Sequence, residues 1–134
     1  MNKFYQPDLA ALLLRVGLGV MALAHGLLKV LVFTPEGTVG FFASMGLPAI
    51  LAYLTIFIEV VGGIALIIGA CSRWVSASMV PILLGATFLA HWQAGWLFSN
   101  QGGGWEFPMF WTLALVVQFF LGNGRYAAPL PGNK

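Results

Sequence analysis

The sequence predicts an all-α membrane protein, a bundle of four transmembrane helices, and two observations support this fold class. Hydrophobic residues make up 60% of the 134 residues, only 7% are charged, and the mean hydropathy is +0.91. Soluble domains carry roughly a quarter charged residues, so this chain has too little polar surface to face water. The apolar runs are continuous rather than alternating, which favours helices over the strands of a barrel.

Four apolar runs have about the length of 20 helical residues that crosses a hydrocarbon core of about 30 Å. We expect transmembrane helices near residues 9–33, 49–70, 74–98 and 107–122. Proline and glycine residues occur in the connections between these runs, as is typical of turns and loops. The connection 71–73 is so short that the second and third helices must be antiparallel neighbours, whereas the connection 34–48 has room to dip into the membrane interface. Residues 1–134 therefore form one transmembrane domain.

The cations in the loops predict how the bundle is oriented. The cations on the side of the N-terminus are Lys3, Arg73, Arg125 and Lys134, whereas the opposite loops carry only Glu36 and Glu106. By the positive-inside rule, both termini face the cytoplasm, which makes the chain a multi-pass protein of a bacterial inner (plasma) membrane. The lipid bilayer is thus its expected partner. A net charge of +2 without a basic patch argues against nucleic acid.

Cysteine usage limits the redox chemistry of the chain itself. Cys71 is the only thiol, so neither an intramolecular disulfide nor a CxxC pair can form. A structural role, a reactive thiol and an acylation site all stay open for Cys71.

Six ionisable residues fall within or beside the apolar runs: Arg15, His25, Lys29, Glu59, His91 and Glu106. An ionised side chain at the centre of a membrane helix costs about 3 kcal/mol, so these residues should face the bundle interior or one another. A rotation of 100° per residue brings Arg15, His25 and Lys29 onto one face of the first helix. Glu59 shares its face with Gly62, where a neighbouring helix can approach closely.

The rise of about 1.5 Å per residue predicts a polar layer in the outer half of the bundle, about 21 to 26 Å from the cytoplasmic end, formed by His25, Glu59, His91 and Glu106. Two interpretations of this layer stay open. The first is a proton-exchanging functional site, since histidine titrates near neutrality. The second is charge neutralisation, in which Lys29 and Arg15 pair with the two glutamates and the histidines pack through hydrogen bonds.

Metal, haem and quinone are the ligands that this layer suggests. Two histidines and two glutamates suit zinc or iron, but no Glu-x-x-His or His-x-x-x-His pair occurs, so no metal ligands are assigned. His25 and His91 lie at the right depth to ligate a haem, although the neighbouring carboxylates disfavour one. A quinone fits best. Its apolar slot would be lined by Trp92, Trp96, Trp105, Phe110 and Trp111. The alternative is that these five side chains face lipid or pack in the core.

In the quinone hypothesis, the candidate catalytic residues are Glu59, Glu106 and His25, with the two glutamates relaying protons. The candidate cofactor-binding residues are His25, Lys29, His91, Trp92 and Trp105. The histidines would donate hydrogen bonds to the ring carbonyls, and Lys29 would offset negative charge.

Five motifs, in this order, resemble the DoxX family over nearly the whole chain: Leu14-Arg15, Ala24-His25-Gly26-Leu27-Leu28-Lys29, Phe41-Phe42-Ala43-Ser44-Met45-Gly46-Leu47-Pro48, Glu59-Val60-Val61-Gly62-Gly63 and Gly102-Gly103-Gly104-Trp105-Glu106-Phe107. The closing Gly122-Asn123-Gly124-Arg125-Tyr126 is also similar to the end of that family.

The resemblance implies a small four-helix inner-membrane protein, related to the membrane subunit of thiosulfate:quinone oxidoreductase and linked to quinone and oxidative stress. The family's polar positions match His25, Lys29, Glu59 and Glu106, and His91 matches its usual histidine late in the third helix. The expected function is a quinone-linked oxidoreductase component or accessory subunit, whose partner is a redox enzyme subunit. Whether the chain is itself an enzyme stays open. The alternatives are a non-catalytic membrane scaffold for redox-stress enzymes and a small transporter, and either could be a homo-oligomer.

Overall fold

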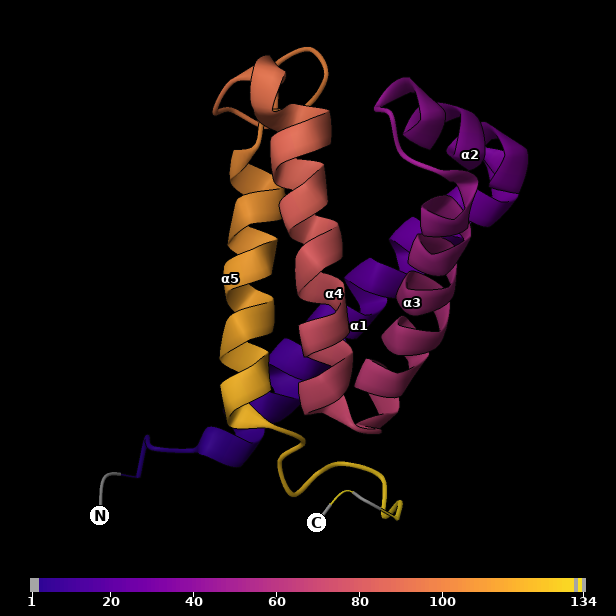
Figure 1. Ribbon diagram of the computed structural model, residues 1–134. Helices are drawn as coiled ribbons and strands as arrows, with labels where there is room; N and C mark the ends of the chain where they lie inside the picture. Colours follow the sequence, from indigo (N-terminus) through magenta and orange to yellow (C-terminus); the bar gives the residue numbers. More distant parts are fainter. Residues whose placement is uncertain (1–2, 132, 134) are drawn as a thin grey trace.

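The computed structural model describes residues 3–131 and 133, and the regular secondary structure in this part of the chain is helical (Figure 1). The helices are α1 (Pro7–Leu31), α2 (Thr34–Ser44), α3 (Ala49–Ile68), α4 (Ser72–Gly85) and α5 (Glu106–Leu121). A π-helical segment (Ala86–His91) and a 3-10 turn (Trp92–Ala94) continue α4. The all-α class is therefore confirmed for the described residues. Lys134, one of the cations used to predict the orientation, lies outside them.

Three helical segments are long and apolar enough to cross a membrane: α1, α3 and the continuous segment Ser72–Ala94. They correspond to the first three predicted spans. Helix α5 is apolar but has only 16 residues, fewer than the roughly 20 that a full span needs. The fourth span therefore stays a prediction.

The helices alternate in direction, so that the two ends of the bundle differ (Figure 1). The first described residues, the link from α3 to α4 and the segment after α5 lie at one end, which we call the terminal end. Helix α2 and the loop 95–105 lie at the opposite end, which we call the loop end. Helix α1 crosses the bundle obliquely, and its most extensive contact is with α3.

The close contact between α1 and α3 depends on glycine. A Cβ added to Gly19 would lie 2.7 Å from the carbonyl oxygen of Gly63, and a Cβ on Gly63 would lie 2.7 Å from the backbone nitrogen of Leu23. Small residues at such contacts let two membrane helices approach until their backbones touch. On the other face of α3, a Cβ on Gly62 would lie 2.7 Å from the side chain of Met79 in α4. The role expected for the glycines beside Glu59 is thus confirmed.

The core lies between α1, α3, α4 and α5, and its buried members are Leu18, Ala22, Leu66, Met79, Leu83, Trp111 and Leu115. The outer faces of the same helices are also apolar. Phe120 is 75% exposed and Phe110 is 70% exposed, and many other large apolar side chains lie open on the surface. A surface of this kind suits contact with lipid tails, whereas monomeric soluble proteins rarely expose such large apolar patches.

Hydrogen bonds from other segments cap the helix ends at the terminal end. The last helical carbonyl of α3, Ile68 O, accepts a hydrogen bond from the N–H of Ala128 at 2.9 Å. Asn123 Oδ1 accepts one from the N–H of Ser72, at the start of α4, at 2.8 Å. Since helix ends leave backbone groups without intrahelical partners, the segment after α5 satisfies groups that lipid could not.

The connection 34–48, for which the sequence analysis predicted no helix, contains α2. Thr34 Oγ1 accepts a hydrogen bond from the N–H of Gly37 at 3.2 Å, Pro35 occupies the first turn, and Glu36 adds a negative charge there. These are ordinary signals for a helix start, so α2 could have been predicted from them.

The glycine contact predicts opposite effects for two neighbouring substitutions in α1. Gly19→Ala should lower the free energy of unfolding by about 1 to 3 kcal/mol, because the added methyl group meets the backbone of α3. Gly17→Ala is the matched control, since a Cβ there has no heavy atom within 4 Å, and it should be neutral or stabilising by up to about 1 kcal/mol. Thermal unfolding followed by circular dichroism in lipid nanodiscs measures both, and equal stability of the two variants would contradict the packing described.

Candidate functional site

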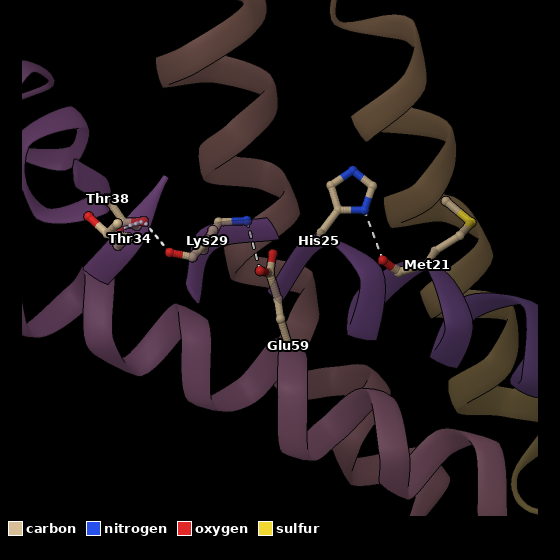
Figure 2. A network of polar contacts seen from close by, with 6 residues as sticks. All are labelled: Met21, His25, Lys29, Thr34, Thr38 and Glu59. Atoms are coloured by element: carbon tan, nitrogen blue, oxygen red, sulfur yellow. Dashed lines mark hydrogen bonds and ion pairs between the residues drawn. The ribbon is translucent and has the colours of Figure 1, made fainter. Parts of the chain in front are cut away.

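An ion pair inside the bundle joins α1 to α3. Lys29 Nζ donates a hydrogen bond to Glu59 Oε2 at 2.8 Å, and the two side chains are 19% and 6% exposed (Figure 2). It is the one salt bridge found among the described residues. Removing one partner of a buried pair leaves an uncompensated charge, so each residue restricts what can replace the other. A pairing of Lys29 with a glutamate, which the charge-neutralisation interpretation predicts, is thus present.

His25 lies one helical turn before Lys29 and has a defined hydrogen bond. Its Nδ1 lies 2.8 Å from the carbonyl oxygen of Met21, which can only accept, so Nδ1 carries the proton (Figure 2). The ring meets Trp111 of α5 edge-on, with 4.8 Å between the ring centroids. In the neutral imidazole, Nε2 is therefore the acceptor, and no hydrogen bond to it occurs within the described residues.

Helix α2 lies over the end of α1 that carries Lys29. Its one buried residue is Thr38, which is 3% exposed. Thr38 Oγ1 lies 2.9 Å from the carbonyl oxygen of Thr34 and 3.3 Å from that of Lys29 (Figure 2). This hydroxyl therefore ties α2 to the backbone of the residue whose ammonium group pairs with Glu59.

The structure brings His25, Lys29 and Glu59 together, and we call these three residues the polar cluster. Figure 2 shows the carboxylate of Glu59 directed toward the part of α1 that carries Lys29 and His25. The contacts of His91 and Glu106 are elsewhere, at the loop end. His91 Nδ1 lies 2.7 Å from the carbonyl oxygen of Gly103, and Glu106 Oε1 accepts a hydrogen bond from the N–H of Phe98 at 3.4 Å. In residues 3–131 neither side chain is bonded to the polar cluster.

The predicted aromatic set is divided between two places. Trp92 stacks on Trp105 with 5.0 Å between centroids, and Trp96 meets Trp105 edge-on at 4.7 Å. Trp92 and Trp96 are about half exposed, and Phe110 is 70% exposed. Trp111, in contrast, is buried against His25. Only Trp111 of this set therefore contacts the polar cluster.

The expected pairing of Arg15 with a glutamate is wrong. Arg15 is 1% exposed, and its Nη1 donates hydrogen bonds to the carbonyl oxygens of Leu66 at 2.8 Å and Ile67 at 2.7 Å. Both carbonyls belong to the last turn of α3, where helical carbonyls lack intrahelical partners and the helix dipole is negative. The guanidinium therefore caps α3 instead of neutralising a carboxylate.

A groove of about 180 Å³ runs between α1 and α5 beside the polar cluster. Its lining is apolar and includes Leu14, Met21, Phe107 and Trp111. Trp111 Nε1 is buried and has no hydrogen-bond partner among the described residues. Two of the lining residues, Met21 and Trp111, also contact His25, although His25 itself does not line the groove. The sequence analysis included Phe110 and Trp111 of this lining but missed Leu14 and Met21, since a groove between two helices leaves no pattern in either one.

These features define an all-helical membrane protein with an ion pair inside its bundle. The chain belongs to the DoxX family, whose family model matches residues 10–92 and so includes the whole polar cluster. The resemblance stated above is thereby confirmed, although Trp105 and Glu106 fall outside the matched residues.

The chain is also similar to "Putative oxidoreductase CatD" of Bacillus subtilis (strain 168), with 40% identity over 86 residues. The match covers 64% of this chain and 61% of the length of that relative. No solved structure matches the chain.

The ion pair predicts strong coupling between its two members. Lys29→Met and Glu59→Gln should each lower the free energy of unfolding by about 3 kcal/mol, and the double variant should lose clearly less than the sum, since no lone charge then remains buried. Unfolding of the four proteins of this cycle, measured in the same lipid, gives the coupling energy. A control cycle pairs Lys29→Met with Glu106→Gln, which should be additive. Additive losses in the Lys29 and Glu59 cycle would refute the pairing.

Proposed function

We propose that the protein is a component of a quinone-linked oxidoreductase in a bacterial inner membrane, and that the groove beside the polar cluster holds the quinone head group. The observation that carries this proposal is the position of the groove, which lies between α1 and α5 and is lined by Met21 and Trp111, the two residues that contact His25. A quinone diffuses within the bilayer, so a lateral entrance of this kind suits it. The oxidoreductase name of the similar Bacillus protein agrees with the proposal.

The residues present fit such a ligand. Binding sites of this class combine an apolar lining with a few placed polar groups. Trp111 Nε1 supplies a buried hydrogen-bond donor, and a quinone carbonyl is an acceptor. The volume of about 180 Å³ is small for a ligand pocket, so it suits a ring, with any apolar tail left in the lipid.

A quinone supplies two-electron chemistry coupled to the uptake of two protons, and the chain's own residues handle the protons. The bond from Nδ1 of His25 to Met21 fixes the ring and leaves Nε2 to exchange a proton beside the groove. Glu59 is the second proton-exchanging group, and Lys29 holds its carboxylate in place through Oε2. The apolar lining of the groove would exclude water from the bound ring.

The other site assignments extend the proposal to the loop end. Glu106 lies at the first turn of α5, and in this proposal it passes protons between the polar cluster and solvent. The stacked Trp92 and Trp105, with His91, are assigned to cofactor binding on the sequence argument alone, since their contacts are with Phe88, with the loop 95–105 and with one another.

In this proposal, the electrons must come from a partner protein. The chain has one cysteine and no dinucleotide-binding motif, so it has neither a dithiol nor a nucleotide site of its own. A redox enzyme subunit is therefore the expected partner. A scaffold without catalysis is the competing function, and it requires no bound quinone.

The proposed membrane arrangement has four spans, with α5 as the fourth, and both termini in the cytoplasm. At the terminal end, Lys3 precedes α1, Arg73 lies in the first turn of α4 and Arg125 follows α5, whereas Glu36 in α2 and Glu106 at the start of α5 belong to the loop end. This asymmetry supports a cytoplasmic terminal end by the positive-inside rule. The polar cluster then lies nearer the outer side of the membrane.

Quinone binding tests the proposal. Wild-type protein purified in its native lipids should carry quinone, detected by an oxidised-minus-reduced absorption spectrum and by solvent extraction. His25→Ala and Trp111→Phe should each reduce the bound quinone by about tenfold, the effect of losing about 1.4 kcal/mol of binding free energy.

Ser78→Ala is the control for this experiment, because Ser78 lies on the exposed face of α4 and bonds only to the carbonyl oxygen of Val75. All variants are compared after their melting curves show that they are folded. Equal quinone content in wild type, His25→Ala and Trp111→Phe would reject the site and favour the scaffold.

A further inference from the structure

A second groove, of about 230 Å³, lies between α4 and α5. The two helices pack along one another (Figure 1). The lining of the groove is apolar and consists of Ala77, Val80, Val116, Phe119 and Phe120. Ligand pockets are usually larger than this, so the groove suits a stretch of an apolar chain and not a whole ligand. We call it the α4–α5 groove.

An exposed cation, Arg73, adjoins the α4–α5 groove on its terminal side. Arg73 does not line the groove, but it precedes Ala77 by one helical turn and Val80 by two, so the three residues share a face of α4. The guanidinium also contacts the lining residue Phe119. Arg73 Cζ lies 5.7 Å from the centroid of that ring, and Arg73 Nε donates a hydrogen bond to the Phe119 carbonyl oxygen at 3.0 Å.

Trp74, beside Arg73, marks the depth of this end of the groove. It is 70% exposed and meets Phe119 edge-on, with 6.1 Å between the ring centroids. Exposed tryptophan is enriched where a membrane meets water. Arg73 and Trp74 belong to the first turn of α4, and Phe119 belongs to the last turn of α5. The guanidinium therefore lies at the level of lipid head groups, and the groove extends from there toward the acyl chains.

No acidic side chain neutralises Arg73. Within the described residues its guanidinium forms no ion pair. At the terminal end, Asp8 accepts a hydrogen bond from the backbone N–H of Arg125 at 3.0 Å. The acidic residues away from this end are Glu36, Glu59 and Glu106. A second copy of the chain, in the same membrane orientation, would thus bring to the groove no acidic side chain other than the already bonded Asp8.

A phospholipid supplies both an apolar chain for the groove and an anion for Arg73. The planar guanidinium matches a phosphate through charge and through paired N–H donors, and neither Nη of Arg73 has a hydrogen bond within the described part of the chain. A zwitterionic head group would bring its own cation toward Arg73, so an anionic lipid is favoured.

We propose that the α4–α5 groove binds an anionic phospholipid, with an acyl chain in the groove and the phosphate on Arg73. The proposal uses the membrane arrangement proposed above, which places the site in the cytoplasmic leaflet, where basic pockets between helices bind anionic head groups. It does not depend on the quinone site, whose lining shares no residue with the α4–α5 groove.

The head-group contact is tested by native mass spectrometry of the full chain in detergent, titrated with phosphatidylglycerol or with phosphatidylcholine. Wild type should bind the anionic phosphatidylglycerol about fivefold more tightly, the effect expected of one cation near a head group. Arg73→Gln should bind the two lipids equally, with its affinity for phosphatidylcholine unchanged, which also shows that the variant is folded. Arg73→Lys should keep most of the preference, because it keeps the charge.

Arg125→Gln is the matched control, since it removes the same charge at the same end of the bundle. The guanidinium of Arg125 lies over the ring of Tyr126, 5.0 Å from its centroid, and not against the groove. This variant should keep the wild-type preference. Equal affinity of wild type for the two lipids would overturn the proposal, as would an equal loss of preference in Arg73→Gln and Arg125→Gln.

The groove itself is tested by filling it. Ala77→Leu should lower the affinity for both lipids by about fivefold, because the larger side chain displaces the acyl chain. Ser78→Leu adds a larger side chain at the neighbouring exposed position and should leave both affinities unchanged. Unchanged binding in Ala77→Leu would overturn the proposal. A dimer in the wild-type spectra that Ala77→Leu abolishes and Ser78→Leu retains would also overturn it, since a second copy would then occupy the groove.

Discussion

The ion pair between Lys29 and Glu59 is the interaction on which the arrangement of the bundle depends. Lipid offers no hydrogen bonds, so a charged side chain on a membrane helix must find its partner on another helix. This pair does so between α1 and α3, the two helices whose backbones meet at Gly19 and Gly63. Packing and charge pairing therefore fix the same helix contact, and each would be strained if the other were lost.

The interior face of α1 changes from polar to apolar and back to polar along the helix. From the terminal end, Arg15 is followed by the apolar Leu18 and Ala22 and then by His25 and Lys29, and α3 runs in reverse from Glu59 to the apolar Leu66. Apolar residues thus separate Arg15 from the polar cluster. Protons exchanged at the cluster would then pass through the loop end, which agrees with the role proposed for Glu106.

Much of the fold could be predicted, because continuous apolar runs indicate membrane helices. Helical phase also placed Lys29 and Glu59 correctly on inward faces. Other assignments could not be made from side-chain patterns. Arg15 caps backbone carbonyls, which carry no sequence signal. The depth predicted for His91 assumes an ideal α-helix. This part of the chain is π-helical and then 3-10, so its rise and rotation per residue differ from those of an α-helix.

The protonation state of Glu59 tests the central claim most directly. An infrared difference spectrum between wild-type protein and Glu59→Gln, both in lipid, isolates the bands of this one side chain. If Lys29 and Glu59 form an ion pair, the difference spectrum shows the loss of a carboxylate band. Loss of a protonated carboxyl band instead would mean that Glu59 is neutral in the bundle, and the ion pair that organises α1 and α3 would be contradicted.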